Sequence, residues 1–225
     1  MPADPAPDPA EAPPPTAARL DYRRAALATA DLDPDPIIQF NRWLAEAAAL
    51  LEEPNAMTLA TAGADGRPSA RMVLLRAATR VGFDFYSNHE SRKGRELAER
   101  PWAALVFHWP PLQRQVRVEG PVALVPAAEA DGYFALRPRQ SQLGAWASPQ
   151  SQAVPDRAWL EARLAEAARR FQDAPVPRPP HWGGYRLQPA AIEFWQGRPG
   201  RLHDRLRYTS DLQAPGGWRI ERLAP

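Results

Sequence analysis

An alternation of apolar and polar residues with a period of two begins near residue 56, and it limits what this chain can fold into more than any other feature. Such a period is typical of β-strands that bury one face. Short turns separate runs at residues 57–61, 69–75, 83–87, 102–109, 113–119 and 121–125. Six neighbouring strands joined by short turns predict an antiparallel meander that closes as a barrel.

Helical patterns flank and interrupt these strands. Asp35 and Pro36 predict a helix start, and apolar residues at helical spacing follow until Pro54 ends the pattern. Residues 126–136 and 156–171 predict two more helices. Four late strands, expected at 184–187, 192–196, 202–208 and 218–223, would complete the same barrel. The predicted fold class is therefore mainly β with accessory helices.

Composition sets the limits of the domain. Residues 1–17 are mostly proline, alanine, aspartate and glutamate, which predicts a disordered tail. Residues 18–225 are predicted to form a single domain, because 225 residues with 44% hydrophobic content suffice for one good core.

The same composition excludes several functional classes. A formal net charge of +2, with basic and acidic residues interspersed, argues against nucleic acid as the main partner. The absence of cysteine excludes disulfides, thiolate metal sites and a cysteine nucleophile, and no metal is expected. Without a leader-like start or an apolar run of membrane-spanning length, we expect a soluble cytoplasmic protein with no membrane partner.

A predicted helix start forms the first candidate site. Ser91 stands where an N-cap is expected, so free backbone N–H groups and two cations, Arg92 and Lys93, meet at one helix N-terminus. This arrangement favours a phosphate site, although both cations could be ordinary solvated charges. Lys93 is the only lysine among 28 Lys and Arg residues, which favours a specific need for an ammonium group. Nearby, Arg71 and Arg76 are five residues apart, so they face opposite sides of a strand and are expected to serve different groups.

Two further segments carry polar groups suited to ligands. Tyr133, Arg137 and Ser141 recur at four-residue spacing, which on a helical turn places them on one side, and no carboxylate lies among them. They suit a second phosphate, although a polar surface loop is the alternative. In an extended strand Arg201 and His203 would share one face with a further arginine, Arg205, which favours an anionic or proton-exchanging ligand over a structural histidine.

These motifs together resemble the pyridoxamine (pyridoxine) 5′-phosphate oxidase family, from about Arg19 to the C-terminus. The resemblance rests on Arg71-Met-Val-Leu-Leu-Arg76, Tyr86-Ser87, Ser91-Arg92-Lys93, Gln113-Arg-Gln115-Val, Tyr133 with Arg137-Pro-Arg, Ser141-Gln-Leu-Gly-Ala-Trp146, Gln150-Ser151, Trp182-Gly-Gly184, Glu193-Phe-Trp195-Gln-Gly197 and Arg201-Leu-His-Asp-Arg205. It implies an FMN-binding split β-barrel that works as a homodimer, with FMN at the interface. The implied reaction oxidises pyridoxamine or pyridoxine 5′-phosphate to pyridoxal 5′-phosphate, the last step of vitamin B6 cofactor synthesis and salvage. Dioxygen would be the acceptor and hydrogen peroxide the second product.

The resemblance also assigns roles to residues. It implies that FMN is held by Arg71, Met72, Val73, Leu74, Leu75, Arg76, Tyr86, Ser87, Arg92, Lys93, Gln115, Gln150, Ser151, Trp195 and Arg205. It implies that the substrate is held by Arg19, Tyr22, Arg76, Tyr133, Arg137, Ser141, Arg201, Leu202 and His203. Arg201 and His203 would be catalytic, and Arg19 with Tyr22 would form a flap. The family usually has lysine where this chain has Arg76, so phosphate binding is expected to persist with altered geometry.

Three other classes compete with the oxidase. A related split-barrel flavoprotein with a different substrate would be expected to lack the segments 137–146 and 201–205, and both are present. A non-catalytic carrier of flavin or pyridoxal phosphate would be favoured by the loss of Arg201 or His203, and neither is lost. An RNA-binding module is disfavoured, because the aromatic residues follow the pattern of a core and not of an exposed stacking surface.

Overall fold

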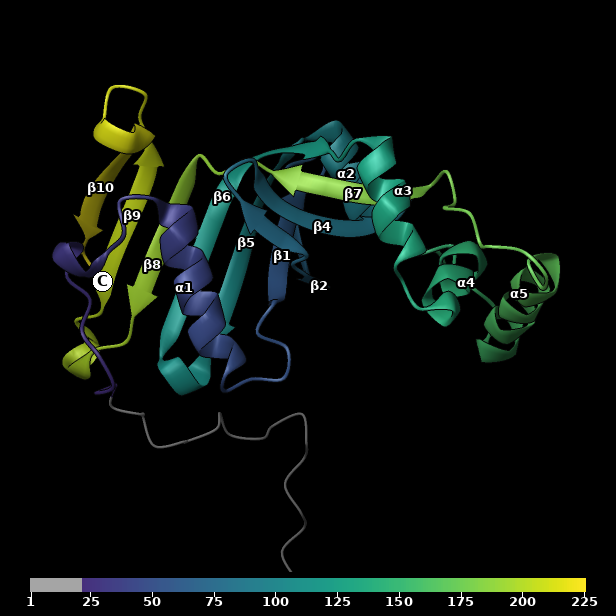
Figure 1. The fold of residues 1–225 in the computed structure, drawn as a ribbon, viewed down its shortest axis with the longest axis horizontal. Helices are drawn as coiled ribbons and strands as arrows, with labels where there is room; N and C mark the ends of the chain where they lie inside the picture. The colour runs from purple at the N-terminus through teal and green to yellow at the C-terminus, as the bar shows by residue number, and fades with distance from the viewer. Residues whose placement is uncertain (1–21) are drawn as a thin grey trace, which may run out of the picture.

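The computed structural model describes residues 22–225 as a curled antiparallel β-sheet with helices packed around it (Figure 1). The strands are β1 (Ala56–Ala62), β2 (Pro68–Leu74), β3 (Ala77–Thr79), β4 (Gly82–Asn88), β5 (Trp102–Trp109), β6 (Arg114–Leu124), β7 (Trp182–Leu187), β8 (Ala191–Gln196), β9 (Asp204–Ser210) and β10 (Trp218–Leu223). The helices are α1 (Pro36–Ala48), α2 (Arg92–Glu99), α3 (Ala127–Ala135), α4 (Arg139–Ala147) and α5 (Arg157–Arg170), with short 3-10 turns η2 (Thr29–Asp31), η3 (Pro110–Leu112), η4 (Pro199–Arg201) and η5 (Pro215–Gly217). The predicted tail and Arg19 lie outside the described residues.

The strand pairs trace a ring that is open on one side. β1 pairs with β2 and β5, β5 with β6, the last part of β6 with β7, β7 with β4, and β4 with β3. β2 and β3 stand at the two ends of this row and do not pair. Only Leu75 and Arg76 separate them, so the chain itself bridges the open side of the ring. The first part of β6 pairs instead with β8, from which β9 and β10 extend the sheet. The predicted mainly β split barrel is therefore confirmed, but of the late strands only β7 joins the ring.

Aromatic side chains fill the space inside the ring. Phe40 on α1 makes edge-to-face contacts with Phe83 and Phe107, with ring centroids 4.9 Å apart in both pairs. All three side chains are fully buried, and each contributes roughly 1.5–3 kcal/mol relative to an exposed position. The predicted start of α1 is confirmed, because the Asp35 carboxylate accepts a hydrogen bond from the Ile37 N–H at 2.9 Å.

One predicted turn in the sheet is wrong. The sequence predicts separate strands at 113–119 and 121–125, divided at Gly120, but β6 is one strand that runs through Gly120 and Pro121. A side chain at Gly120 would collide with the carbonyl oxygen of Gln188, so glycine permits a close backbone approach there. Pro121 accepts a hydrogen bond from the Gln188 N–H through its own carbonyl. The Gly-Pro pair thus marks the place where β6 exchanges one partner strand for another.

A smaller helical lobe lies beside the barrel. Figure 1 shows α4 and α5 beyond α3, at the end of the molecule remote from β10. Phe134, Leu143 and Phe171 pack there with Trp182 at the start of β7. Between residues 22 and 225 no helix is long and apolar enough to cross a membrane.

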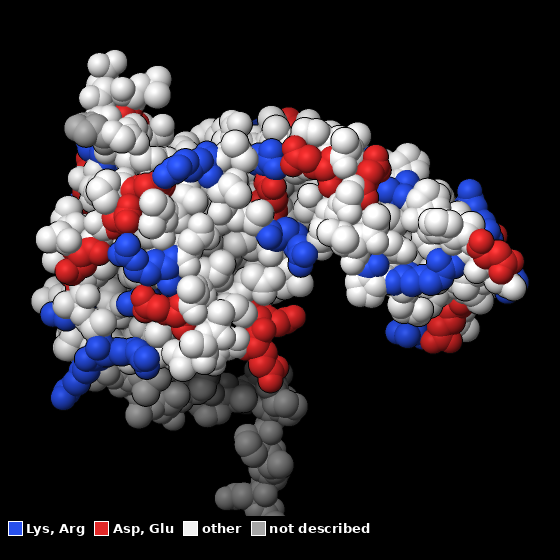
Figure 2. All heavy atoms as spheres, in the orientation of Figure 1, with Lys and Arg blue, Asp and Glu red and all other residues white. Residues whose placement is uncertain are grey.

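Charges of both signs are interspersed around α1. On the face drawn in Figure 2, Lys and Arg side chains alternate with Asp and Glu and do not merge into one basic surface. Arg80 lies 2.8 Å from Asp35, and Arg114 lies 2.6 Å from Glu46. Exposed pairs of this kind contribute little stability, typically about 0–1 kcal/mol each.

Candidate active site

Lys93 is buried at the N-terminus of α2. Ser91 caps this helix as predicted, and its hydroxyl accepts the Gly94 N–H at 3.3 Å. The Lys93 ammonium donates to Ser87 Oγ at 3.1 Å, to Ser91 Oγ at 3.2 Å and to Gln150 Oε1 at 2.7 Å. Burial and the nearby Arg71 lower the pKa of Lys93 to about 8. With 8% of its surface exposed, Lys93 is not an ordinary solvated charge.

Glu96, one turn further along α2, forms ion pairs with two neighbouring cations. Its carboxylate accepts from Thr61 Oγ1 at 2.5 Å and from Ser69 Oγ at 2.6 Å, and it pairs with Arg71 at 3.1 Å and Arg92 at 2.8 Å. Burial alone would raise the pKa of Glu96, but the four hydrogen bonds lower it to about 2. Sequence reasoning missed this role, since Thr61 and Ser69 reach Glu96 only when the β1–β2 hairpin packs on α2.

These contacts fix the position of Arg71. Its Nη1 donates to the Leu59 carbonyl at 3.2 Å and to Thr61, and its Nη2 donates to Ser69 and Glu96. Only the Nε–H of the five guanidinium N–H groups is left for another partner. We define the first cationic pocket as Arg71, Arg92, Lys93 and Glu96. Its three cations and one carboxylate give a net charge near +2, which is opposite and equal to that of a phosphate monoester dianion.

A second cationic pocket lies around Trp182. The guanidinium carbon of Arg137 lies 4.6 Å above the Trp182 ring, and that of Arg76 lies 4.5 Å above Tyr133. The Tyr86 ring packs against both aromatic rings, with its centroid 4.1 Å from that of Tyr133 and 5.4 Å from that of Trp182. Arg76 thus contacts a different group from Arg71, as the strand parity predicted.

Arg137 presents an unsatisfied donor in this pocket. Its Nη1 is buried and has no hydrogen-bond partner among residues 22–225. Burial lowers the pKa of Arg137. Because an unpaired buried charged donor is costly, this nitrogen indicates an anionic ligand.

The two cationic pockets share a wall. A cavity of about 290 Å³ is lined by Asn88, Arg137, Ser141, Gly144, Ala145, Ser148, Gln150 and Trp182. Gln150 belongs to the Lys93 cluster, whereas Arg137 and Ser141 belong to the second pocket. The cavity of the second cationic pocket therefore borders the first pocket at Gln150.

The expected geometry of Tyr133, Arg137 and Ser141 is wrong in one respect. They do not lie on one continuous helix, because α3 ends at Ala135 and α4 begins at Arg139. Pro138 precedes α4, and proline disfavours a helical conformation of the residue before it. Arg137 and Ser141 still line the same cavity, while Tyr133 packs on Trp182, 6.1 Å away between ring centroids.

A third group lies at the other end of the sheet. Gln115, Trp195 and Arg205 are direct cross-strand partners on β6, β8 and β9, so they form one row on one face. His203 lies 4.6 Å from the Trp195 ring, and Tyr22 lies 5.9 Å from Trp195 and 5.8 Å from His203. The described part of the predicted flap therefore lies beside His203.

The predicted strand face of Arg201, His203 and Arg205 is also corrected. β9 begins only at Asp204, while Arg201 ends η4 with φ 64°. The preceding Pro199 and Gly200 form a turn that an extended strand cannot contain. Ser151, a predicted cofactor residue, also has a positive φ of 70°. Strained conformations in non-glycine residues cost about 1–3 kcal/mol and concentrate at functional sites.

One hydrogen bond selects the tautomer of the neutral His203 ring. Its Nδ1 accepts a hydrogen bond from the Arg198 N–H at 3.1 Å, which places the ring proton on Nε2. Burial and the charge of Arg201 lower the pKa of His203. Arg205 is engaged differently, since it forms two hydrogen bonds with Glu193 at 2.8 and 3.0 Å.

Within one chain the third group does not meet the cationic pockets. Five strand steps separate β2 from β9 along the sheet order. At about 4.8 Å per step, this corresponds to roughly 24 Å. Tyr22, Trp195 and His203 therefore lie far from Arg71 along the sheet of one chain.

The remaining predicted residues differ in exposure. Met72, Leu74 and Leu202 are exposed, whereas Leu75 is buried and Val73 packs partly against the core. Met72 and Leu74 alternate with Arg71 and Val73 along β2, so they face the outside of the barrel.

The fold defines a class of protein, the mainly β split barrel, here with two clusters of cationic side chains. Residues 44–170 match the family model described as pyridoxamine 5′-phosphate oxidase, and residues 182–225 match the pyridoxine 5′-phosphate oxidase C-terminal dimerisation region. The chain belongs to the pyridoxamine 5′-phosphate oxidase family, as the sequence motifs indicated, and it is therefore an oxidoreductase.

Individual relatives agree with this assignment. The chain is 60% identical over 208 residues to a pyridoxine/pyridoxamine 5′-phosphate oxidase of Burkholderia multivorans, covering 92% of this chain and 97% of the relative. It superimposes on PhzG of Burkholderia lata 383, solved with tetrahydrophenazine-1-carboxylic acid, with a TM-score of 0.81 and 36% identity, covering 89% and 98% of the two chains. An FMN-binding protein from Nostoc punctiforme shares the fold, with a TM-score of 0.68 and 18% identity over 86% and 100% of the chains.

Proposed function

We propose that this chain catalyses the FMN-dependent oxidation of pyridoxamine 5′-phosphate and pyridoxine 5′-phosphate to pyridoxal 5′-phosphate. Dioxygen is the acceptor and hydrogen peroxide the second product. The observation that carries the proposal is the pair of neighbouring cationic pockets, around Lys93 and Arg137, that border each other at Gln150. Two phosphorylated ring compounds, cofactor and substrate, need two such pockets side by side.

The residues fit these two ligands. The first cationic pocket has a net charge near +2, which would balance a phosphate dianion. It would hold the FMN phosphate, with Gln150 and Ser151 at its border. The orphaned Nη1 of Arg137 would donate to the substrate phosphate, together with Arg76, Tyr133 and Ser141. FMN, when bound, supplies a two-electron acceptor that dioxygen reoxidises.

The third group would act on the substrate ring. Because Nδ1 of His203 already accepts the Arg198 N–H, His203 would donate a hydrogen bond from Nε2 to a substrate oxygen or amine. Arg201 would stabilise negative charge on the ring hydroxyl. Trp195 and Tyr22 would cover the ring and exclude water, while Arg205 and Gln115 would border the cofactor.

A second copy of the chain would complete the site. Met72 and Leu74 are 64% and 45% exposed, on the outer face of the sheet. The strand registers place the Gln115–Trp195–Arg205 row on the same face. A groove of about 570 Å³ runs along it, lined by Leu51, Glu52, Glu53, Ala56, Thr58, Met72, Val106 and His108. We infer a homodimer in which this face of one subunit brings its third group to the cationic pockets of the other, and the match to a dimerisation region supports it.

Aerobic turnover of pyridoxamine 5′-phosphate by FMN-loaded protein tests the proposal. We expect equal amounts of aldehyde and peroxide, and a loss of turnover of roughly 100-fold or more in His203→Ala and Arg201→Ala. FMN content is the control, because neither residue lies in the first cationic pocket. A yellow protein that makes no aldehyde from either phosphorylated substrate would contradict the proposed reaction.

One observation favours a second candidate. The 36% identity to PhzG, which was solved with a tricyclic carboxylic acid, suggests that a carboxylate could replace the substrate phosphate. The same assay with tetrahydrophenazine-1-carboxylic acid separates the two. We expect the phosphorylated substrate to be preferred, and we expect Arg137→Ala to remove that preference by raising the KM.

A further inference from the structure

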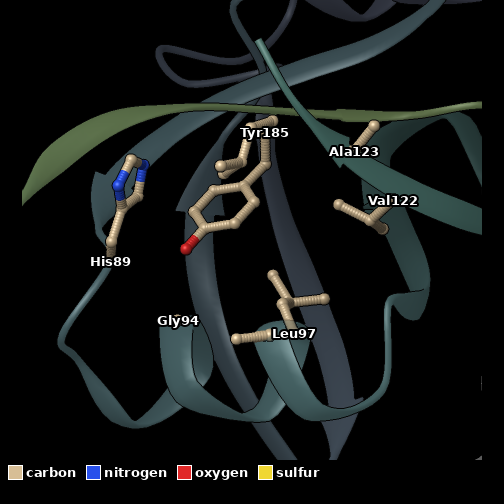
Figure 3. Close-up of a pocket in the computed structure, with 8 residues that line it drawn as sticks. His89, Gly94, Leu97, Val122, Ala123 and Tyr185 are labelled. Atoms are coloured by element: carbon tan, nitrogen blue, oxygen red, sulfur yellow. The ribbon is translucent and has the colours of Figure 1, made fainter.

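An apolar pocket lies beside α2, on a helix face next to the one that carries Lys93 and Glu96 (Figure 3). Its volume is about 160 Å³. It is lined by His89, Gly94, Leu97, Ala98, Val122, Ala123, Leu124 and Tyr185. None of these residues belongs to the cationic pockets or to the third group, and no carboxylate, lysine or arginine lines the space.

Tyr185 gives this pocket its one strongly placed polar group. The side chain is 4% exposed, stacks on Phe85 with ring centroids 5.3 Å apart, and meets the edge of His89 at 5.2 Å. Figure 3 shows its hydroxyl oxygen pointing into the space between His89 and Leu97, above Gly94. This oxygen therefore faces whatever fills the pocket.

The Tyr185 hydroxyl can donate a hydrogen bond to a molecule in the pocket. Burial raises the pKa of Tyr185 to about 12, so the group remains a neutral donor under ordinary conditions. A ligand oxygen that accepts from this hydroxyl would contribute roughly 0.5–1.5 kcal/mol. His89 is a second polar residue of the pocket, and its Nε2 is buried and has no partner in the described part of the chain.

The size and lining of the pocket select the class of ligand. An apolar protein cavity of about 150 Å³ accepts one benzene ring and stays free of water. The pocket beside α2 has a similar volume, with Leu97 and Val122 as walls. A charged ligand would find no counter-ion there, and an extended ring system would exceed the volume.

We propose that this pocket binds a small neutral single-ring aromatic molecule that carries one hydroxyl group, with its ring between Leu97 and Val122 and its oxygen paired with Tyr185 Oη. The proposal does not depend on the reaction proposed above. Phenol is the simplest probe of this class, and toluene has nearly the same shape without the oxygen.

Titration of FMN-loaded, full-length protein with methyl labels on leucine and valine tests the site. We expect phenol to shift the Leu97, Val122 and Leu124 methyl signals in a saturable way. Tyr185→Phe is expected to weaken phenol binding by roughly fivefold to tenfold, since it removes one hydrogen bond. The same variant should leave toluene binding within a factor of about two, because the ring contacts persist.

A second variant keeps the test decisive. Ala98 on α2 lines the pocket and is exposed, so Ala98→Phe should fill it and should abolish binding of both probes. Saturable phenol binding that Tyr185→Phe leaves unchanged would overturn the proposal, as would the absence of any saturable shift. If Tyr185→Phe does not fold, unchanged phenol binding by Ala98→Phe would overturn it alone.

Discussion

Glu96 is a negative residue in the middle of a site built for a negative ligand. We assign Glu96 no contact with the cofactor itself, but it joins Arg71 on β2 to Arg92 on α2, and both arginines are assigned to the FMN phosphate. Its carboxylate is fully ionised under ordinary conditions, because its pKa is about 2. We therefore interpret Glu96 as a positioning residue that holds two arginines for the phosphate of FMN.

Replacement of Glu96 by glutamine should weaken FMN binding by about tenfold, as is typical when a supporting partner of a ligand-binding group is lost. A carboxamide cannot accept from both arginines at once, so their orientation is lost. Fluorescence titration with FMN and riboflavin measures the effect, and riboflavin binding should hardly change because riboflavin has no phosphate. Glu99→Gln on the same helix is the matched control. Tighter FMN binding by Glu96→Gln would show that the carboxylate only opposes the phosphate.

Lys93 makes FMN binding sensitive to alkaline pH. In the free protein its pKa is lowered to about 8, so the neutral form gains population as the pH rises through 8. At pH 9 the charged fraction is about a tenth, so FMN affinity should fall by up to about tenfold between pH 7 and pH 9. The measurement is the same titration at several pH values. Lys93→Arg should stay nearly independent of pH in this range, and an equal loss in that variant would assign the effect to another group.

Single residues also show where sequence reasoning reaches its limit. The Ser91 cap and the special status of Lys93 followed from local spacing and composition, because a helix start depends on neighbouring residues. The roles of Glu96, Thr61 and Ser69 did not follow, since their contacts form between segments 27 to 35 residues apart. Arg71 and Arg76 do contact different groups as predicted, but strand parity is not the reason, because β2 ends at Leu74 and Arg76 lies in the corner before β3.

At the scale of elements, Asp204 anchors the segment around Leu27 to the start of β9. Its carboxylate accepts the Leu27 N–H at 3.0 Å and pairs with Arg222 at 2.6 Å and Arg198 at 3.4 Å. Further along this segment Tyr22 packs on Gly197, where an added Cβ would lie 2.7 Å from its ring. The segment from Tyr22 to Leu27 is thereby held over Trp195 and His203.

Loss of this anchor should affect substrate and not cofactor. In Asp204→Ala we expect the KM for pyridoxamine 5′-phosphate to rise about fivefold to tenfold, since charge-assisted hydrogen bonds of roughly 1.5–3 kcal/mol are lost beside the substrate. FMN affinity should stay within twofold in a fluorescence titration. Asp211→Ala in the following loop is the control. An unchanged KM would mean that the segment keeps its position without Asp204.

The elements that sequence reasoning placed well are the regular ones. A period of two located most strands, and Asp35 with Pro36 located α1, because both signals are local. The errors fall at corners, where tertiary contacts decide. Gly120 and Pro121 look like a turn but lie where β6 changes partners, and Pro138 divides a pattern that looked like one helix. The turn at Pro199 and Gly200 delays β9 and gives Arg201 its positive φ.

For the whole molecule, the distance between the cationic pockets and the third group predicts complementation between subunits. Lys93→Ala and His203→Ala proteins should each be nearly inactive. After unfolding and refolding together, half of the dimers would contain one chain of each kind, and one of their two sites would be intact. About a quarter of wild-type activity should therefore return, as expected for an isologous dimer.

The refolded mixture is compared with each variant refolded alone. Recovery near a quarter places the two residues in one site from different chains. A mixture as inactive as its components, with dimers confirmed by light scattering, would mean that each site is built within one chain.

The burial of the only lysine has a practical consequence for handling this protein. The sequence offers amine-directed reagents a single lysine side chain, and this side chain is 8% exposed, so it should react slowly in the folded state. A protease that cuts after lysine has one target, and it reaches that target only when α2 detaches from the barrel. The rate of cleavage after Lys93 therefore measures how often α2 opens locally, and bound FMN should slow that cleavage.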